Sequence, residues 1–214
     1  MGTITLVRHG QANSAAQDEA GYDKLSDLGH QQALWLGEWI AAQDETFDLI
    51  LSGSLRRHLE TAKGMGFDAP VIDPRLNELD YFNLGAALQA HSGREMTGPE
   101  GFADHFLDVL HAWERADIQG NESFASFEGR VSAVLEEAAQ PGRQVLCVTS
   151  GGVISMILRH LLKLDLQRMV HVSLPILNTS VHRVHVLPVG TILAGYNAVP
   201  HLDPADRSHA RTHF

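Results

Sequence analysis

The sequence predicts an α/β protein, a three-layer sandwich in which helices flank a mostly parallel central sheet and a helical cap is inserted. Short apolar runs rich in β-branched residues alternate with segments of helical periodicity, an order typical of parallel sheets covered on both faces. The chain has 214 residues, enough to bury a stable core without disulfides. Its one cysteine, Cys147, lies inside an apolar run and is expected to be a small buried strand residue.

Strands and helices alternate through the first half of the chain. Residues 3–7 form an apolar, β-branched run, and Ser26 then offers an N-cap to a helix whose apolar residues recur at helical spacing. A second strand and a second helix follow, and Gly64 and Gly66 end that helix. The expected elements are strands at residues 3–7, 47–51 and 71–72, and helices that start after Ser26 and at Leu55.

The second half of the chain predicts the cap and the rest of the sheet. The expected elements, in order, are helices at about 99–115 and 123–139, a strand at 144–149, a helix after Gly151 and Gly152, and strands at 180–187 and 191–198. No repeat or linker divides the chain, so we expect one domain over residues 1–214 with a cap insertion at about 80–140. The tail, residues 201–214, is expected to be loosely ordered or an oligomer contact, which leaves a homo-oligomer open.

The composition excludes several classes of function. With 26 acidic and 16 basic residues the formal charge is -10, which argues against a nucleic-acid surface and requires any phosphate site to be a local positive pocket. The N-terminal residues enter a strand pattern at once, and the apolar runs are too short to cross a bilayer, so we expect a cytoplasmic protein without membrane contact. The thirteen histidines are scattered without metal-ligand spacing, so we expect no metal.

Residues 6–11, at the end of the first strand, carry the best candidates for chemistry. Arg8 offers a guanidinium fork that matches a phosphate, and the imidazole of His9 can act as a nucleophile. Gly10 allows the backbone to approach a ligand closely. The ends of strands in an open α/β sheet are also where ligand sites form. Taken alone the motif is short, and His9 could equally be a structural histidine.

Further motifs follow in a specific order. Residues 25–33 start the first helix, residues 52–62 contain Arg57, and residues 76–78 contain Glu78. Together with residues 6–11 they resemble the motifs of the histidine phosphatases, also called the phosphoglycerate-mutase-like superfamily, and the likeness covers nearly the whole chain. Shorter matches are Glu122, Ser123 and Arg130 in the cap, and Tyr196, Asn197, His201 and Leu202 near the C-terminus.

The resemblance implies roles for specific residues. His9 would attack phosphorus and become phosphohistidine, and Glu78 would act as general acid and then as general base. Arg8 and Arg57 would hold the phosphoryl oxygens, and no cofactor would be needed. Further phosphate contacts are expected from Ser150, Gly151, Gln11 and Asn13. From the residues alone, Glu78 could instead be an exposed loop carboxylate, and Arg56 is the better candidate for a solvated helix arginine.

One position departs from the family pattern. The family most often has a histidine before the paired glycines, where this chain has Ser150. Ser150 could be an N-cap, a phosphate donor at the helix N-terminus, or both. Losing an imidazolium donor would slow an enzyme by about 100- to 1,000-fold without abolishing the reaction. His182 could reach the vacant position from its strand, although a packing role is the simpler interpretation.

Two hypotheses follow for the function. The first is a phosphatase that hydrolyses a phosphate monoester, on either a phosphorylated small molecule or a phosphoprotein. A mutase is disfavoured because the asparagine of mutase-type members has no match at Ala15. The second is a catalytically weakened phospholigand-binding or regulatory domain on the same fold. Intact His9 and Glu78 favour the enzyme, and Ser150 favours the binding domain.

Overall fold

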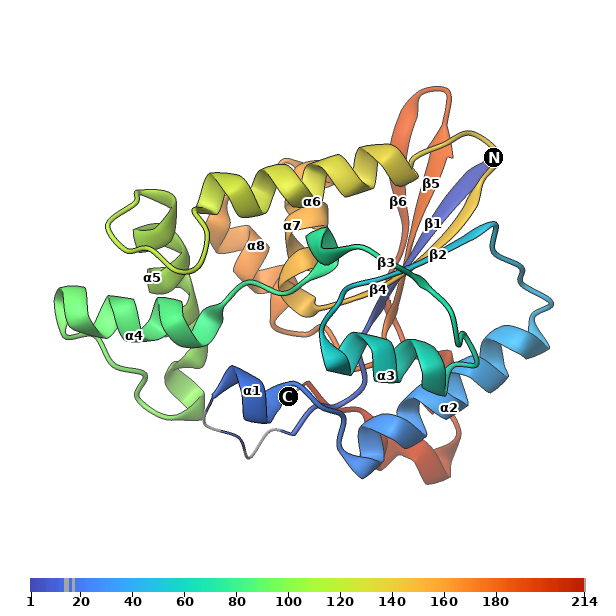
Figure 1. The fold of residues 1–214 in the computed structure, drawn as a ribbon, viewed down its shortest axis with the longest axis horizontal. Helices are drawn as coiled ribbons and strands as arrows, with labels where there is room; N and C mark the ends of the chain where they lie inside the picture. The colour runs from blue at the N-terminus through green and yellow to red at the C-terminus, as the bar shows by residue number, and fades with distance from the viewer. Residues whose placement is uncertain (14–15, 17, 214) are drawn as a thin grey trace.

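The sheet of the computed structural model confirms the predicted α/β fold. The structure describes residues 1–13, 16 and 18–213, so that Ala15 lies outside the described residues. Within them, six strands form one sheet in the order β3-β2-β4-β1-β5-β6 (Figure 1). Strands β1 to β4 are parallel to one another, β5 is antiparallel to β1, and β6 is antiparallel to β5. The strands are β1 (Gly2–Arg8), β2 (Leu49–Ser52), β3 (Val71–Ile72), β4 (Gln144–Thr149), β5 (Val181–Leu187) and β6 (Gly190–Ala198).

Strands β1 and β4 lie at the centre of the sheet and bring two candidate site residues together. Every residue of β1 is buried, and so is all of β4 except its first residue. Strands that are covered on both faces are rich in apolar residues, as β4 is from Val145 to Val148. In their parallel register Arg8 lies opposite Thr149. His9 and Ser150, the next residues on each chain segment, therefore leave the sheet side by side at its carboxyl edge.

Alternate residues of the central strands face two different helical layers. Val7 and Val148 pack with Ala33 and Leu36 of α2 (Asp27–Ala42) and with Ala62 of α3 (Arg56–Gly64). The opposite face, with Ile4, Leu6, Val145 and Cys147, packs under α6 (Phe124–Ala138) and α7 (Gly151–Leu162). The predicted N-cap of α2 is confirmed, because Ser26 Oγ accepts a hydrogen bond from the Gly29 N–H at 3.1 Å.

The cap contains one more helix than the sequence predicts. Helices α4 (Tyr81–Ser92) and α5 (Phe102–Glu114) project beyond the end of the sheet, whereas α6 lies alongside α7 (Figure 1). Helix α4 was not predicted because it buries only Leu84 and Leu88, too few apolar positions to give a periodic signal. Two other short helices, α1 (Glu19–Tyr22) and α8 (Leu166–Ser173), were not predicted either.

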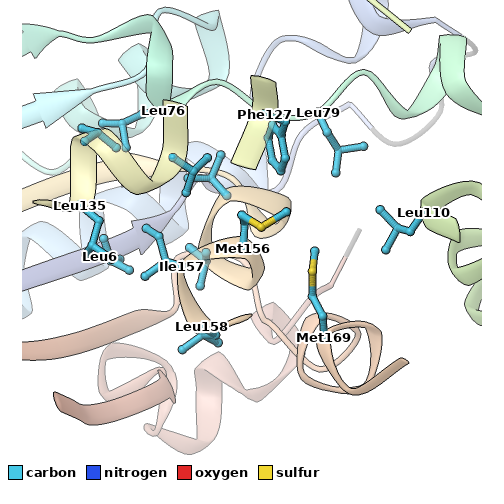
Figure 2. Close-up of a cluster of buried hydrophobic side chains, with 14 of the residues drawn as sticks. Leu6, Leu76, Leu79, Leu110, Phe127, Leu135, Met156, Ile157, Leu158 and Met169 are labelled. Atoms are coloured by element: carbon cyan, nitrogen blue, oxygen red, sulfur yellow. The ribbon is translucent and has the colours of Figure 1, made fainter. Parts of the chain in front are cut away.

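A single apolar cluster joins the cap to the sheet. It includes Leu6 of β1, Met156 of α7, Met169 of α8 and Leu110 of α5 (Figure 2). Because α5 is buried against the same core as the strands, the cap is held in a fixed position above the sheet edge. Among the described residues no helix is both long and apolar enough to cross a membrane.

The expectation of a loosely ordered tail is wrong for residues 201–213. His201, Leu202 and Ala210 are buried. Gln32 of α2 donates to the carbonyl of Ala210 at 2.6 Å, and the Arg207 guanidinium lies 4.7 Å from the centre of the Trp35 ring. The tail lacks helical or strand periodicity because its short 3₁₀ turns pack through a few isolated contacts.

Candidate active site

A cavity of about 360 Å³ lies between the carboxyl edge of the sheet and the cap. Its two sides differ in chemistry, and we name them the floor and the cap wall. The floor consists of Arg8, His9, Arg57, Glu78, Gly151 and Gly152. The cap wall consists of Leu79, Tyr81, Phe82, Met96, Phe102 and Phe106. The cavity thus has a polar side built on strand ends and an apolar side built mainly on α4 and α5.

His9 follows β1 and is only 2% exposed. Its Nδ1 lies 2.7 Å from the carbonyl oxygen of Gly10, so Nδ1 carries the proton and Nε2 keeps its lone pair. Burial, and then the charges of Arg57 and Arg8, lower the pKa of His9 well below its ordinary value. The imidazole is therefore neutral at physiological pH, which is the form that can act as a nucleophile.

The close approach of two glycines shapes the turn after His9. A Cβ on Gly10 would lie 2.5 Å from the carbonyl oxygen of Gly29 at the start of α2, so no larger residue fits without a backbone shift. The Gly10 N–H donates to Thr61 Oγ1 of α3 at 3.0 Å. These contacts fix the backbone that carries His9 against both α2 and α3.

Two buried guanidinium groups flank His9. Arg8 is 8% exposed, donates from one amine to the Ile176 carbonyl, and has a buried Nε without a hydrogen-bond partner. Arg57, in the first turn of α3, is 1% exposed, and Asp23 Oδ1 lies 3.2 Å from its Nη1. The floor thus holds two buried guanidinium groups, and Asp23 pairs with one of them.

Glu78 occupies the N-terminus of α7. Its Oε2 accepts a hydrogen bond from the Gly152 N–H at 3.0 Å, and its Oε1 accepts one from the Leu79 N–H at 3.0 Å. A Cβ on Gly152 would lie 2.2 Å from Oε1, so this glycine is what allows the carboxylate to approach the helix. The two backbone N–H groups therefore fix the position of the Glu78 carboxyl group beside the first turn of α7.

Ser150 is at the N-cap position of α7, but its side chain does not cap the helix. Its Oγ lies 2.6 Å from Nε2 of His58, and both residues are completely buried. The His58 ring centre is 5.7 Å from that of His9. The sequence-based interpretation of Ser150 as a side-chain cap is therefore wrong, and the pairing with His58 was not predicted. The only signal in the sequence is that His58 follows Arg57 within the motif at residues 52–62.

His182 does not reach the floor. Its Nε2 lies 3.0 Å from Ser180 Oγ, and its Nδ1 accepts from the Asn197 N–H at 3.3 Å. Burial lowers the pKa of His182 to about 3. Both ring nitrogens are used inside the β5–β6 layer, so the simpler expectation of a packing histidine fits the structure.

Gln11 and Asn13, which the sequence predicts as phosphate contacts, do not line the cavity. Gln11 Oε1 accepts from the Ser26 hydroxyl at 2.8 Å, and the Asn13 amide donates to the Gly21 carbonyl at 3.0 Å. Both side chains bind the loop that surrounds α1. Gln and Asn can bind either a loop or a ligand, so residue type alone does not predict which contact they make.

The cap wall and the residues beside Arg57 were not predicted as parts of the site. The ring centres of Tyr81, Phe102 and Phe106 lie 5.5 to 5.7 Å from one another. Tyr22 lies near the floor, with its ring centre 5.0 Å from the Arg57 guanidinium and 6.5 Å from the His9 ring. Aromatic clusters of this geometry form a rigid apolar surface. A ligand with a charged end and an apolar body therefore fits the two sides of the cavity.

The floor has the groups needed to bind and transfer a phosphoryl group. Two guanidinium groups can neutralise phosphoryl oxygens, a neutral imidazole can attack, and a carboxylate can exchange a proton. Among the described residues, no cluster of three or more His, Cys, Asp or Glu side chains has an arrangement that could hold a metal ion.

The chain is similar to known phosphoglycerate mutases and phosphatases. A 2,3-bisphosphoglycerate-dependent phosphoglycerate mutase from Rhizobium etli is 26% identical over 202 residues, which cover 86% of this chain and 91% of the mutase. A phosphoserine phosphatase from Entamoeba histolytica, solved with 3-phosphoglyceric acid, superposes with a TM-score of 0.70 at 21% identity and covers 94% of this chain and 100% of its own.

A mycobacterial glucosyl-3-phosphoglycerate phosphatase, solved with VO3, has a TM-score of 0.61 at 25% identity and covers 92% of this chain and 98% of its own. The family model described as histidine phosphatase superfamily (branch 1) matches residues 4–199. The matched residues include every residue of the floor, the cap helices, and all of the sheet except Gly2 and Thr3. The chain belongs to the histidine phosphatase superfamily.

Proposed function

We propose that the protein is a metal-independent phosphatase that hydrolyses a phosphate monoester through a phosphohistidine on His9. The observation that carries the proposal is the neutral, buried imidazole of His9 between the Arg8 and Arg57 guanidinium groups. Electrostatic stabilisation by fixed charges in a water-poor site is the main source of rate in phosphoryl transfer. The two arginines supply such charges without a metal ion.

The reaction has two steps on this floor. In the first, His9 Nε2 forms a bond to phosphorus, the bond from phosphorus to the ester oxygen breaks, and protonated Glu78 gives its proton to the leaving alcohol. In the second, the Glu78 carboxylate takes a proton from a water molecule, the water oxygen bonds to phosphorus, and the bond to Nε2 breaks. Inorganic phosphate leaves, and Glu78 is again protonated.

Hydrolysis is favoured over mutase activity by the lining of the cavity. A mutase must hold an acidic substrate and return the phosphoryl group to it. Arg8 and Arg57 are the only Lys or Arg residues among the described residues that line the cavity, and the opposite side is apolar. The floor cations are thus taken up by the phosphoryl group, which leaves none for a second anion. The glucosyl-3-phosphoglycerate phosphatase relative at 25% identity also supports a phosphatase.

The cap wall points to a substrate with an apolar or aromatic body. Tyr81, Phe102 and Phe106 offer ring faces and edges opposite the floor. Burying an aromatic group against them stabilises binding by about 25 cal/mol per Å² of apolar area. We therefore expect aryl phosphates to be better substrates than phosphoglycerates.

A second function is a binding domain that holds a phosphorylated ligand without turning it over. The observation that favours it is Ser150, which provides a hydroxyl where the family resemblance leads us to expect an imidazole. Hydrolysis of an aryl phosphate in the presence of a chelator separates the two functions. The phosphatase predicts turnover that His9→Ala abolishes. Binding of inorganic phosphate by the wild-type protein without turnover of any ester in a broad panel would support the binding domain instead.

A further inference from the structure

The buried pair of His58 and Ser150 has no role in the two-step mechanism. Nε2 of His58 is 2.6 Å from Ser150 Oγ, and neither side chain has any exposed surface. Ser150 precedes Gly151, which lines the cavity, and the centre of the His58 ring, on α3, is 5.7 Å from that of His9. A fully buried serine–histidine pair beside a nucleophile calls for a chemical explanation, because isolated buried polar groups are costly.

The surroundings of His58 determine which ring nitrogen carries the proton. Nδ1 is buried without a hydrogen-bond partner. It lies against the backbone of Gly53, where a Cβ would be only 2.2 Å away. A lone pair tolerates this contact better than an N–H group, since orphaned buried N–H groups are rare. The proton is therefore on Nε2, and Nε2–H donates to Ser150 Oγ.

This tautomer leaves the hydroxyl proton of Ser150 available. Ser150 Oγ accepts no bond from the first turn of α7, because the Gly152 N–H donates to Glu78 instead. In the register of β1 and β4, Ser150 leaves the sheet at the same level as His9. The Ser150 side chain is fully buried and only the next residue, Gly151, lines the cavity, so the hydroxyl can donate only to a phosphoryl oxygen that enters between His9 and the N-terminus of α7.

We propose that His58 is a positioning residue that acts through Ser150. His58 Nε2–H orients the serine hydroxyl toward a phosphoryl oxygen, so that a relay of two residues provides the donor that the family resemblance leads us to expect from a histidine at position 150. The proposal rests on the phosphatase function of the same site. Burial and the charge of Arg57 lower the pKa of His58 well below its ordinary value, so the relay donates a hydrogen bond and adds no charge.

The test is a double-mutant cycle with p-nitrophenyl phosphate as the substrate. Ser150→Ala and His58→Ala should each lower kcat/KM by about 100-fold, the typical effect of losing one transition-state donor. Since the two residues act as one unit, the double variant should be no slower than either single variant. His58→Gln keeps an N–H donor at similar reach and should stay within about tenfold of wild type, which also covers the case in which His58→Ala folds poorly.

A second, independent test moves the imidazole from position 58 to position 150. Ser150→His combined with His58→Ala puts the imidazole at the helix start and vacates the volume that His58 fills. The kcat/KM of this double variant should be at least about tenfold higher than that of His58→Ala alone, because the donor is restored. Ser150→His alone should have a lower kcat/KM than Ser150→His combined with His58→Ala, since two imidazoles cannot occupy the same buried space.

His182→Ala is the matched control, because it removes a second buried histidine that contacts a serine hydroxyl, Ser180 Oγ at 3.0 Å, outside the cavity. It should change kcat/KM by less than about threefold. Additive losses in the cycle, or equal losses for His58→Ala and His182→Ala, would overturn the relay. Absence of turnover in the wild type would count against the phosphatase function instead. In that case the relay is tested by the dissociation constant for orthovanadate. The relay predicts that His58→Ala binds orthovanadate more weakly than His182→Ala does, and equal binding by the two variants would overturn it.

Discussion

The floor and the cap wall of the cavity are built on opposite principles. The floor brings together polar side chains from the end of β1, from α3 and from the segment before α4, beside the backbone of the first turn of α7. The cap wall presents rings from α4 and α5. From this difference we infer two separate roles: the floor performs the chemistry, and the cap wall selects the body of the substrate. Each prediction on activity below tests one of these two roles.

The largest effect is expected for Arg57 on the floor. Arg57→Ala removes one of the two buried cations and should lower kcat/KM for an aryl phosphate by about 1,000-fold or more. Arg56 is the matched control, because it is next in sequence but its side chain is 65% exposed. Arg56→Ala should stay within about threefold of wild type in the same steady-state assay. Similar losses in both variants would mean that helix α3 was disturbed and that no specific cation was needed.

Glu78 should show a loss that depends on the leaving group. Glu78→Gln removes the proton donor and should slow turnover by about 100- to 10,000-fold for an alkyl phosphate, whose leaving alcohol must be protonated. The loss should be much smaller for p-nitrophenyl phosphate, because nitrophenolate leaves without a proton. Comparing kcat for the two esters checks this. An equal loss for both would show that Glu78 only positions the floor.

The cap wall should affect binding more than chemistry. Phe102→Ala removes one ring of the aromatic cluster and should raise KM for an aryl phosphate by about tenfold, with kcat changed by less than about threefold. KM for methyl phosphate should not change, since that ester has no body to contact the wall. Phe67→Ala is a control, because Phe67 belongs to a separate aromatic pair with Phe47. A loss in kcat alone for Phe102→Ala would contradict the division between the two sides.

The last effect concerns stability and not activity, and it comes from two buried histidines outside the cavity, His182 and His201. Burial lowers the pKa of His182 to about 3 and that of His201 to about 4, from an ordinary value of 6.5. Below pH 6.5 the unfolded chain therefore binds protons that the folded chain excludes. The free energy of unfolding should be highest above pH 6.5 and fall with decreasing pH, by about 1.4 kcal/mol per pH unit for each such histidine.

Urea unfolding at pH 7.5 and pH 5.0 measures this slope. His201→Gln removes one titrating group and should make the slope shallower, although the variant also loses the contact between His201 and Thr179. A slope that is the same in the variant would show that His201 does not titrate on unfolding.

The sequence predicted residues of the floor but none of the cap wall. Arg8, His9, Arg57, Glu78 and Gly151 were predicted from short motifs, and the structure brings them to one floor, while their roles stay predictions. Arg8 ends β1 and His9 follows it, and Arg57 and Gly151 lie in the first turns of α3 and α7. Glu78 lies in the loop before α4 and was predicted from the family resemblance.

The contact between His58 and Ser150 joins residues 92 positions apart, and no local pattern encodes it. The same holds for the cap wall. Helix α4 gives little periodic signal, and which rings of α5 face the cavity depends on how the cap packs on α7 and α8. The polar groups of Gln11 and Asn13 contact the loop around α1, and neither residue lines the cavity, so their phosphate contacts stay a prediction. The residues that would select the substrate could therefore not be predicted from the sequence.

The most direct test of the account is to trap the intermediate on His9. The protein is mixed with an aryl phosphate, quenched at alkaline pH and digested, and the peptides are mapped by mass spectrometry. The account predicts one phosphoryl group on His9, stable to base, lost in acid and absent in His9→Ala. Turnover without this adduct, or an adduct that remains in His9→Ala, would contradict the assignment of His9 as the nucleophile.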